Sequence, residues 1–196
     1  MNKSYQLLVS TTEDLISKLG CQQTTLKVIM EQSGLSKGAI YHYVDSKDEL
    51  FGLILKSKII SVNEKFQHAI AENDKPELKS PLEAIASGTK TLLNENNVTN
   101  AIFAYLLSKR ENAAIQGILN ELYEYSLETA SKWIRSGQDS GVITKQLNVN
   151  KTAAMFLTVS YGIRVLHMLS PQSTGEYSID DFYELMFQTL KVNEDK

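Results

Sequence analysis

Residues 24–50 read TTLKVIMEQSGLSKGAIYHYVDSKDEL, two short helical segments separated by a turn of small residues. Thr24 or Thr25 can cap the first segment and Ser36 the second, because their side chains accept hydrogen bonds from the free N–H groups of a helix start. Gly34, between the segments, permits the tight reversal that brings two helices into contact. The stretch therefore predicts a helix-turn-helix whose second helix presents its start to the major groove of DNA.

The flanking residues predict a helix on each side. A first helix is expected from about residue 4 to residue 19, with Gly20 placed to stop it. Its apolar stripe follows the spacing of three and four residues that marks one helix face. The stripe consists of Leu7, Leu8, Thr11, Thr12, Leu15, Ile16 and Leu19. Ser46 and Glu49 match a capping box, in which each side chain bonds the other's backbone, and they predict a long fourth helix over residues 47–73.

The rest of the chain also reads as helices. The prolines lie where helices are expected to begin or end, and no sustained alternation of polar and apolar residues argues for a sheet. Further helices are expected at 82–95, 98–110, 113–139, 151–169 and 179–192. We predict an all-α fold of about nine helices, with a three-helix helix-turn-helix domain over residues 1–46 and a larger helical domain over residues 47–196.

Composition and charge exclude several classes of protein. A hydrophobic fraction of 42% over 196 residues supports a folded core. The single cysteine, Cys21, excludes an internal disulfide and a CxxC metal site, and neither a metal nor another cofactor is expected. No apolar run approaches the ~18 residues of a membrane helix and the start lacks a signal-peptide pattern, so we expect a cytoplasmic protein without a membrane partner.

The charge balance does not indicate a broad basic surface. The net charge is −3, and residues 1–50 carry five lysines and no arginine against six acidic residues. Binding to DNA would then depend on a few lysines aimed at phosphates from one face.

Three segments in order closely resemble the DNA-binding region of the TetR (tetracycline-repressor) family. They are TTLKVIM at 24–30, SGLSKGAIYHY at 33–43 and SKDEL at 46–50. Helix lengths, turn and capping box match the family pattern across roughly residues 7–55, whereas the remainder matches only in being helical and of typical length. Thr11 and Thr12 stand where the family usually has alanines, and Val44 where an aromatic residue often follows the third helix.

The resemblance implies a homodimer that inserts one recognition helix into each half-site of a palindromic operator on double-stranded DNA. Carried over by position, the expected phosphate contacts are Thr25, Tyr41, His42 and Lys47. The residues expected nearest the bases are Ser36, Lys37, Gly38 and Ala39. Lys27 is a further candidate DNA contact, with an ordinary exposed lysine as the alternative. Tyr43 is expected to pack toward the first helix.

The carboxy-terminal region is rich in aromatic residues, which suit either a plain core or a ligand pocket between helices. The candidate ligand contacts are Phe103, Tyr123, Trp133 and Tyr161. Arg110, Glu111 and Arg164 are notable because each charge adjoins an apolar run, although an exposed or ion-paired charge is the alternative. Helices 151–169 and 179–192 are apolar over more than one face, and the resemblance assigns their second face to a dimer interface.

The function expected from these features is a homodimeric transcriptional regulator, a repressor released from its operator by a small organic effector that tilts the fourth helix. The alternative is a helical protein–protein adaptor without specific DNA binding. Residues 34–38, GLSKG, also satisfy the G-x-S-x-G pattern of a catalytic serine turn. That chemistry requires a preceding strand and partner residues that this sequence does not provide, so no catalytic residue and no enzyme are expected.

Overall fold

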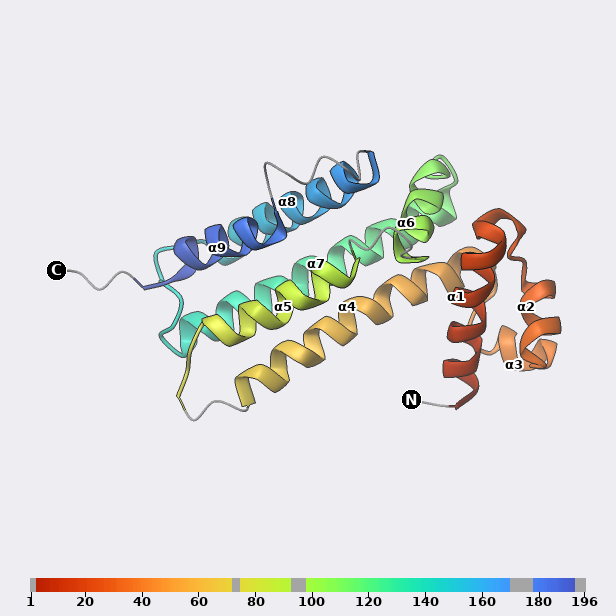
Figure 1. Ribbon diagram of the computed structural model, residues 1–196, viewed down its shortest axis with the longest axis horizontal. Coiled ribbons are helices and arrows are strands. Elements are labelled where there is room, and N and C mark those ends of the chain that lie inside the picture. Colours follow the sequence, from red (N-terminus) through yellow and green to blue (C-terminus); the bar gives the residue numbers. More distant parts are fainter. Residues whose placement is uncertain (1–2, 72–74, 93–97, 170–177, 193–196) are drawn as a thin grey trace. The chain divides into compact units, whose positions relative to one another are not determined.

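The computed structural model describes residues 3–71, 75–92, 98–169 and 178–192. Within these ranges the chain forms nine α-helices and one isolated bridge, between Ile143 and Lys191 (Figure 1). The helices are α1 (Lys3–Gln23), α2 (Leu26–Ser33), α3 (Lys37–Tyr41), α4 (Lys47–Ala71), α5 (Lys79–Leu92), α6 (Val98–Ser108), α7 (Ala113–Asp139), α8 (Val149–Leu169) and α9 (Ile179–Leu190). The predicted all-α fold is confirmed; the expected end of the fourth helix at 73 lies outside the described residues.

The chain divides into two compact units. The first consists of Met1–Lys58 and Asn96–Leu122, and the second of Ile59–Glu95 and Tyr123–Lys196. The division falls within α4 and within α7, so each of these helices contributes residues to both units. The predicted DNA-binding domain, residues 1–46, lies wholly within the first unit.

The first unit is built on α1, which packs against α2 and α6. Five of the seven residues predicted for the buried stripe of α1 are buried, but Leu7 and Leu19 are 43% and 42% exposed. The prediction is wrong for these two because Leu7 lies at the edge of the stripe and Leu19 in the last turn before Gly20. Thr12 is fully buried, and its hydroxyl donates to the carbonyl of Leu8 at 2.7 Å, so the core accepts this polar residue without an unpaired group.

Two of the predicted helix signals are refined by the structure. Gly20 has a φ of 77°, outside the helical range, and interrupts α1 as expected, although the helical hydrogen bonding resumes for Cys21–Gln23. At the start of α4, the Ser46 hydroxyl accepts from the N–H of Glu49 at 3.1 Å. The Glu49 carboxylate accepts from Asp45 at 2.7 Å, one residue before the position that a strict capping box predicts.

The second unit has an aromatic core. Phe66 stacks on Trp133 with ring centroids 4.7 Å apart, and Phe156 meets Phe182 edge to face at 6.1 Å. Around them lie the buried aliphatic residues Leu82, Ile85, Ile134, Ile143, Ile179 and Leu190. Here α5 packs against α9.

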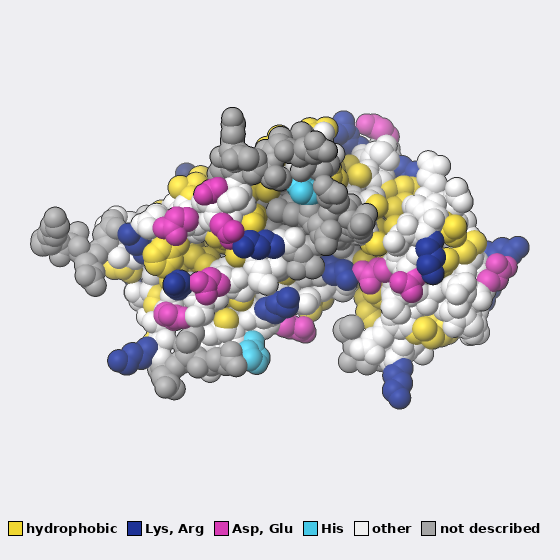
Figure 2. Space-filling view, viewed as in Figure 1, with side chains coloured by type: hydrophobic (Ala, Val, Ile, Leu, Met, Phe, Trp, Pro, Cys, Tyr) yellow, Lys and Arg dark blue, Asp and Glu magenta, His cyan; other side chains and the backbone are white. Residues whose placement is uncertain are grey.

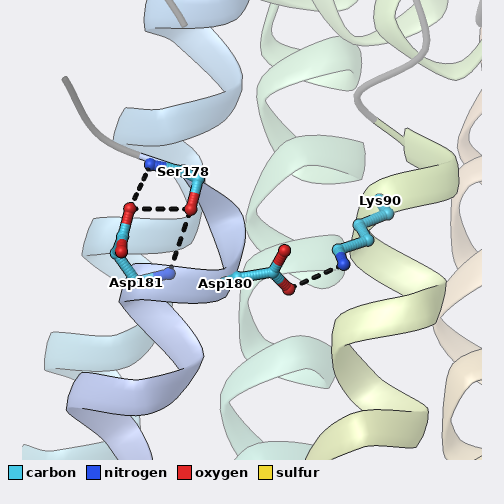
Figure 3. A network of polar contacts seen from close by, with 4 residues as sticks. All are labelled: Lys90, Ser178, Asp180 and Asp181. Atoms are coloured by element: carbon cyan, nitrogen blue, oxygen red, sulfur yellow. Dashed lines mark hydrogen bonds and ion pairs between the residues drawn. The ribbon is translucent and has the colours of Figure 1, made fainter. Parts of the chain in front are cut away.

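Polar contacts fix the start of α9 (Figure 3). Ser178 and Asp181 form a complete capping box: the Ser178 hydroxyl accepts from the Asp181 N–H at 3.2 Å, and the Asp181 carboxylate accepts from the Ser178 N–H at 2.7 Å. These bonds lower the pKa of Asp181. The Asp180 carboxylate pairs with the Lys90 ammonium of α5 at 2.6 Å. This ion pair links the start of α9 to α5, and the capping box satisfies the first N–H groups of α9.

One helix in the described part of the chain, α8, is long and apolar enough to cross a membrane by length and composition. A single such helix is weak evidence for a membrane span. Its buried residues are Thr152, Ala153 and Phe156, and among the described residues Met155, Val165, Leu166 and Leu169 of this helix are exposed.

Candidate nucleic-acid interface

The turn between α2 and α3 follows the predicted chemistry. Thr25 caps α2, its hydroxyl accepting from the N–H of Val28 at 3.3 Å. Thr24, the other candidate, is fully buried and instead donates to the Gly20 carbonyl at 2.9 Å. Gly34 has a φ of 68°, in the left-handed region that favours glycine, and its N–H donates to Met30 at 3.0 Å. α2 and α3 are thereby held in close contact beside α1 (Figure 1).

Ser36 caps α3, and its hydroxyl accepts from the N–H of Ala39 at 3.2 Å. The hydroxyl is therefore a helix cap, and the segment before it is a helix, so the G-x-S-x-G pattern has no catalytic setting. Ile40 is fully buried and anchors α3 in the first unit. Lys37 and Gly38 are exposed, and Ala39 is half-buried. The residues predicted nearest the bases thus lie together on an open helix start.

The aromatic residues after α3 have different roles. Tyr41 is 43% exposed, and the Lys37 ammonium lies 5.5 Å from the centre of its ring. His42 is exposed and meets Tyr43 edge to face at 5.1 Å. Tyr43 is half-buried and contacts Tyr5 of α1 at 5.5 Å, which confirms its expected packing toward the first helix. α3 ends at Tyr41 rather than near Tyr43.

The two remaining lysines of the predicted site differ from each other. Lys27 is highly exposed on α2 and lies 3.9 Å from Glu31, a weak surface pair. The Lys47 ammonium is directed at the end of α1, where it donates to the carbonyls of Cys21 at 2.9 Å and Gln22 at 3.1 Å. No local pattern predicts these two hydrogen bonds, because the acceptors lie 26 and 25 residues before Lys47.

The Lys47 ammonium also lies over two aromatic rings. It is 5.2 Å from the ring centre of Tyr105 in α6 and 5.8 Å from that of Phe51 in α4. A cation at these distances is attracted to the face of a ring. One side chain therefore joins the end of α1, the start of α4 and the inner face of α6, all within the first unit. Its predicted contact with phosphate stays a prediction, and this structural role is added to it.

The charges on the face drawn in Figure 2 are interspersed, with lysine and acidic side chains side by side. This agrees with the net charge of −3. Among the described residues, no three His, Cys, Asp or Glu side chains are grouped so that they could hold a metal ion. The exposed residues around α3 are single basic and polar side chains beside solvent-exposed backbone. Such groups suit contacts with phosphates and base edges.

The four candidate ligand contacts are not gathered in one unit. Phe103 is half-buried on α6 in the first unit, whereas Tyr123, Trp133 and Tyr161 belong to the second. Tyr123 is 44% exposed and Tyr161 half-buried. Trp133 is committed to packing against Phe66, and its indole N–H donates to the Asn63 amide oxygen at 2.7 Å. Their contact with a ligand stays a prediction.

Comparison with known proteins supports the reading of the amino-terminal helices. The family profile described as bacterial regulatory proteins, tetR family, matches residues 8–54. The uncharacterized HTH-type transcriptional regulator YfiR of Bacillus subtilis is 23% identical over 158 residues, which cover 80% of this chain and 76% of YfiR.

Solved structures share the fold at low identity. The fatty acid degradation regulator FadR from Bacillus halodurans superposes with a TM-score of 0.67 at 14% identity, covering 99% of this chain and 97% of FadR. The SmeT–triclosan complex gives a TM-score of 0.68 at 14% identity, covering 98% and 94% of the two chains. SmeT is the repressor of a multidrug efflux pump of Stenotrophomonas maltophilia.

The family profile falls on the helices whose caps, turn and exposed recognition helix are described above, and the whole chain has the fold of these regulators. Members of this family are DNA-binding transcription factors and not enzymes. Residues 8–54, which include most of α1, all of α2 and α3 and the start of α4, match the tetR family of bacterial regulatory proteins.

Proposed function

We propose that this protein is a cytoplasmic homodimeric repressor that binds a palindromic operator and leaves it when a small organic effector binds. Residues 1–46 are the DNA-binding domain and residues 47–196 the effector-binding and dimerisation domain. The observation that carries the proposal is the open start of α3, capped by Ser36 and lined by the exposed Lys37 and Gly38.

The proposed DNA contacts divide by their position on the exposed surface. Ser36, Lys37, Gly38 and Ala39 approach the base edges, since their small side chains let the backbone of α3 enter the major groove. Contacts with phosphate come from Thr25, Lys27, Tyr41, His42 and Lys47, which fix register on the duplex. Thr25, Lys27, Tyr41 and His42 are exposed, and this supports their assignment.

The outward side of α8 supports a dimer. Met155, Leu166 and Leu169 are 52%, 62% and 75% exposed, and they share one side of the helix with Gly162. A Cβ added at Gly162 would meet no atom of its own chain within 4 Å, so a second helix could approach closely there. A water-exposed apolar stripe of this kind is costly unless a partner covers it, and the occupant we propose is α8 of a second copy.

The contribution of α9 to this interface is smaller than its composition indicates. Ile179, Phe182, Tyr183 and Met186 are all buried in the core of their own unit. Leu185, at 54% exposure, is the large apolar residue that α9 leaves on the surface. We therefore assign the main dimer contact to α8.

In the proposed control, an effector binds the helical domain and acts on the DNA-binding helices through α4, which belongs to both units. SmeT, a fold neighbour, was solved with the small molecule triclosan, which supports an effector of this size for the present protein. α4 runs from the first unit into the second as one helix of 25 residues. A tilt of α4 would change the spacing of two recognition helices, which must match half-sites ~34 Å apart. About 1–3 kcal/mol of coupling would lower DNA affinity 5- to 150-fold.

The test is a fluorescence anisotropy titration with DNA from upstream of the gene that encodes the protein. The wild-type protein should bind this DNA far more tightly than a shuffled duplex, as a dimer by light scattering. Lys37→Ala should weaken the specific complex, whereas Lys65→Ala, which removes an exposed lysine outside the proposed interface, should not. Equal affinity for specific and shuffled DNA would contradict the repressor and favour the alternative, a helical protein–protein adaptor.

A further inference from the structure

The surface of α3 carries a cation beside an aromatic ring. The Lys37 ammonium lies 5.5 Å from the centre of the Tyr41 ring. The two residues are four positions apart in one helix, a spacing that places side chains on the same face. A cation at this distance is attracted to the face of a tyrosine ring. Lys37 and Tyr41 therefore form a pair on the surface, and both remain exposed.

This contact distinguishes Lys37 from Lys27, the exposed lysine of α2. The Lys27 ammonium lies 3.9 Å from the carboxylate of Glu31, an anion that offsets its charge. Lys37 instead faces a ring without net charge, so its positive charge is not neutralised. The ring thus orients the ammonium and leaves it able to bind a third group.

The backbone that carries this pair is fixed on both sides of Tyr41. Ile40 is fully buried, and its N–H donates to the Ser36 carbonyl at 3.2 Å. The N–H of His42 donates to the Gly38 carbonyl at 3.0 Å. A tyrosine side chain also has fewer rotatable bonds than a lysine side chain. The ring is therefore the more rigid member of the pair, and the lysine takes its position from it.

The chemistry of an ammonium limits what Lys37 can recognise on DNA. Of the four residues proposed to approach the bases, Lys37 has the charged side chain, whereas the Ser36 hydroxyl already caps α3. An ammonium donates hydrogen bonds and cannot accept them. In the major groove guanine presents two adjacent acceptors, N7 and O6, whereas the N7 of adenine lies beside an amino donor and thymine presents O4 alone. Guanine is therefore the base that Lys37 matches best.

We propose that Lys37 reads a guanine in each operator half-site and that Tyr41 positions it through its ring. This inference rests on the proposed function, since it concerns the base edges that α3 reads. A lysine side chain samples many rotamers in water and loses that freedom when it binds a base. The ring restricts Lys37 before DNA binds, so less entropy is lost on binding. Tyr41 thereby serves specificity through its ring, separately from the phosphate contact proposed for it.

The experiment uses the full-length protein and the duplex from upstream of its gene, with guanines replaced one at a time by deazaguanine. This analogue keeps O6 and the base pair but has carbon in place of N7. At one position of a half-site the replacement should weaken wild-type binding about ten-fold, the loss of a hydrogen bond from a charged donor. Lys37→Met should bind both duplexes equally. Lys27→Met, the matched control, should keep the wild-type ratio of the two affinities.

The role of Tyr41 is tested by the same ratio of affinities for the guanine and deazaguanine duplexes. Tyr41→Leu removes the ring and should lower the ratio about two- to five-fold, the attraction of an exposed cation–ring pair. Tyr41→Phe keeps the ring and should keep the ratio, while the lost hydroxyl weakens binding to both duplexes alike. Added to Lys37→Met, Tyr41→Leu should not change the ratio further. Tyr41 is 43% exposed, so both variants should melt like the wild type by circular dichroism.

The outcomes separate this inference from the proposed function. If the wild-type protein prefers the upstream duplex but Tyr41→Leu keeps the wild-type ratio, the positioning role of Tyr41 is overturned. If no replaced guanine distinguishes the wild type from Lys37→Met, the reading of guanine is overturned while specific binding stands. If the wild-type protein binds upstream and shuffled duplexes equally, the proposed function is contradicted and the inference falls with it.

Discussion

Replacing Lys47 by methionine is expected to destabilise the protein by about 2 kcal/mol, because its ammonium connects three helices of the first unit. It donates to the Cys21 and Gln22 carbonyls at 2.9 and 3.1 Å, which lie at the end of α1. It also lies 5.2 Å from the centre of the Tyr105 ring in α6. Methionine keeps most of the aliphatic length and removes the charge and the donors.

The magnitude follows from opposing contributions. Hydrogen bonds from a charged group contribute about 1.5–3 kcal/mol each when shielded, and less when exposed. The bond to Cys21 is part-buried and the bond to Gln22 exposed, so together they contribute roughly 3 kcal/mol. Against this, a cation in the first turn of α4 opposes the helix dipole, and its removal returns about 0.5–1 kcal/mol. The balance is a loss of about 2 kcal/mol.

The assay is urea denaturation of the full-length protein, with Lys37→Met as the matched control. Lys37 is exposed on α3, so this control should change the free energy of unfolding by less than about 0.5 kcal/mol. Lys47→Arg should recover part of the loss, since it restores charge and donors at the same position. A change in the free energy of unfolding for Lys47→Met as small as that expected for the control would refute the structural reasoning.

The same variant tests the proposed phosphate contact. Lys47→Met should lower the slope of log affinity against log salt concentration by roughly one unit, and weaken binding to all DNA sequences alike. If the protein is destabilised but the salt slope equals that of the wild type, Lys47 does not contact phosphate. Its role is then the connection of α1, α4 and α6.

Three further outcomes test separate parts of the structure. Gly162→Glu should convert the dimer to monomers or insoluble protein in light scattering, whereas Gly117→Glu, also exposed and without neighbours within 4 Å, should leave it dimeric. Gly34→Ala forces a side chain onto a φ of 68° and should cost about 1–2 kcal/mol in urea denaturation, against little change for Gly38→Ala. Cys21 should react slowly with a thiol reagent until urea is added, because burial raises its pKa; fast labelling of the folded protein would contradict this.

The helix-turn-helix was predictable because its signals are local. The caps formed by Thr25 and Ser36 and the left-handed turn at Gly34 each depend on residues within four positions. The bonds that the sequence could not reveal are those between distant segments. The indole of Trp133 donates to Asn63, 70 residues away, and Lys47 reaches carbonyls of α1. No periodicity reports such pairs, because they depend on how the helices pack.

The spacing of apolar residues also does not show whether an apolar helix face packs within the chain or against a second copy. Both α8 and α9 carry more hydrophobic residues than one face requires, and the sequence predicted an interface on both. In α9 the additional apolar residues are buried in the core of its own unit, where Met186 is 8% exposed. In α8 it stays outside, as at Leu169, which is 75% exposed. Burial within the chain therefore distinguishes the two helices. A charged residue in place of Met186 would disrupt the core of the second unit, so it would not test the dimer interface alone.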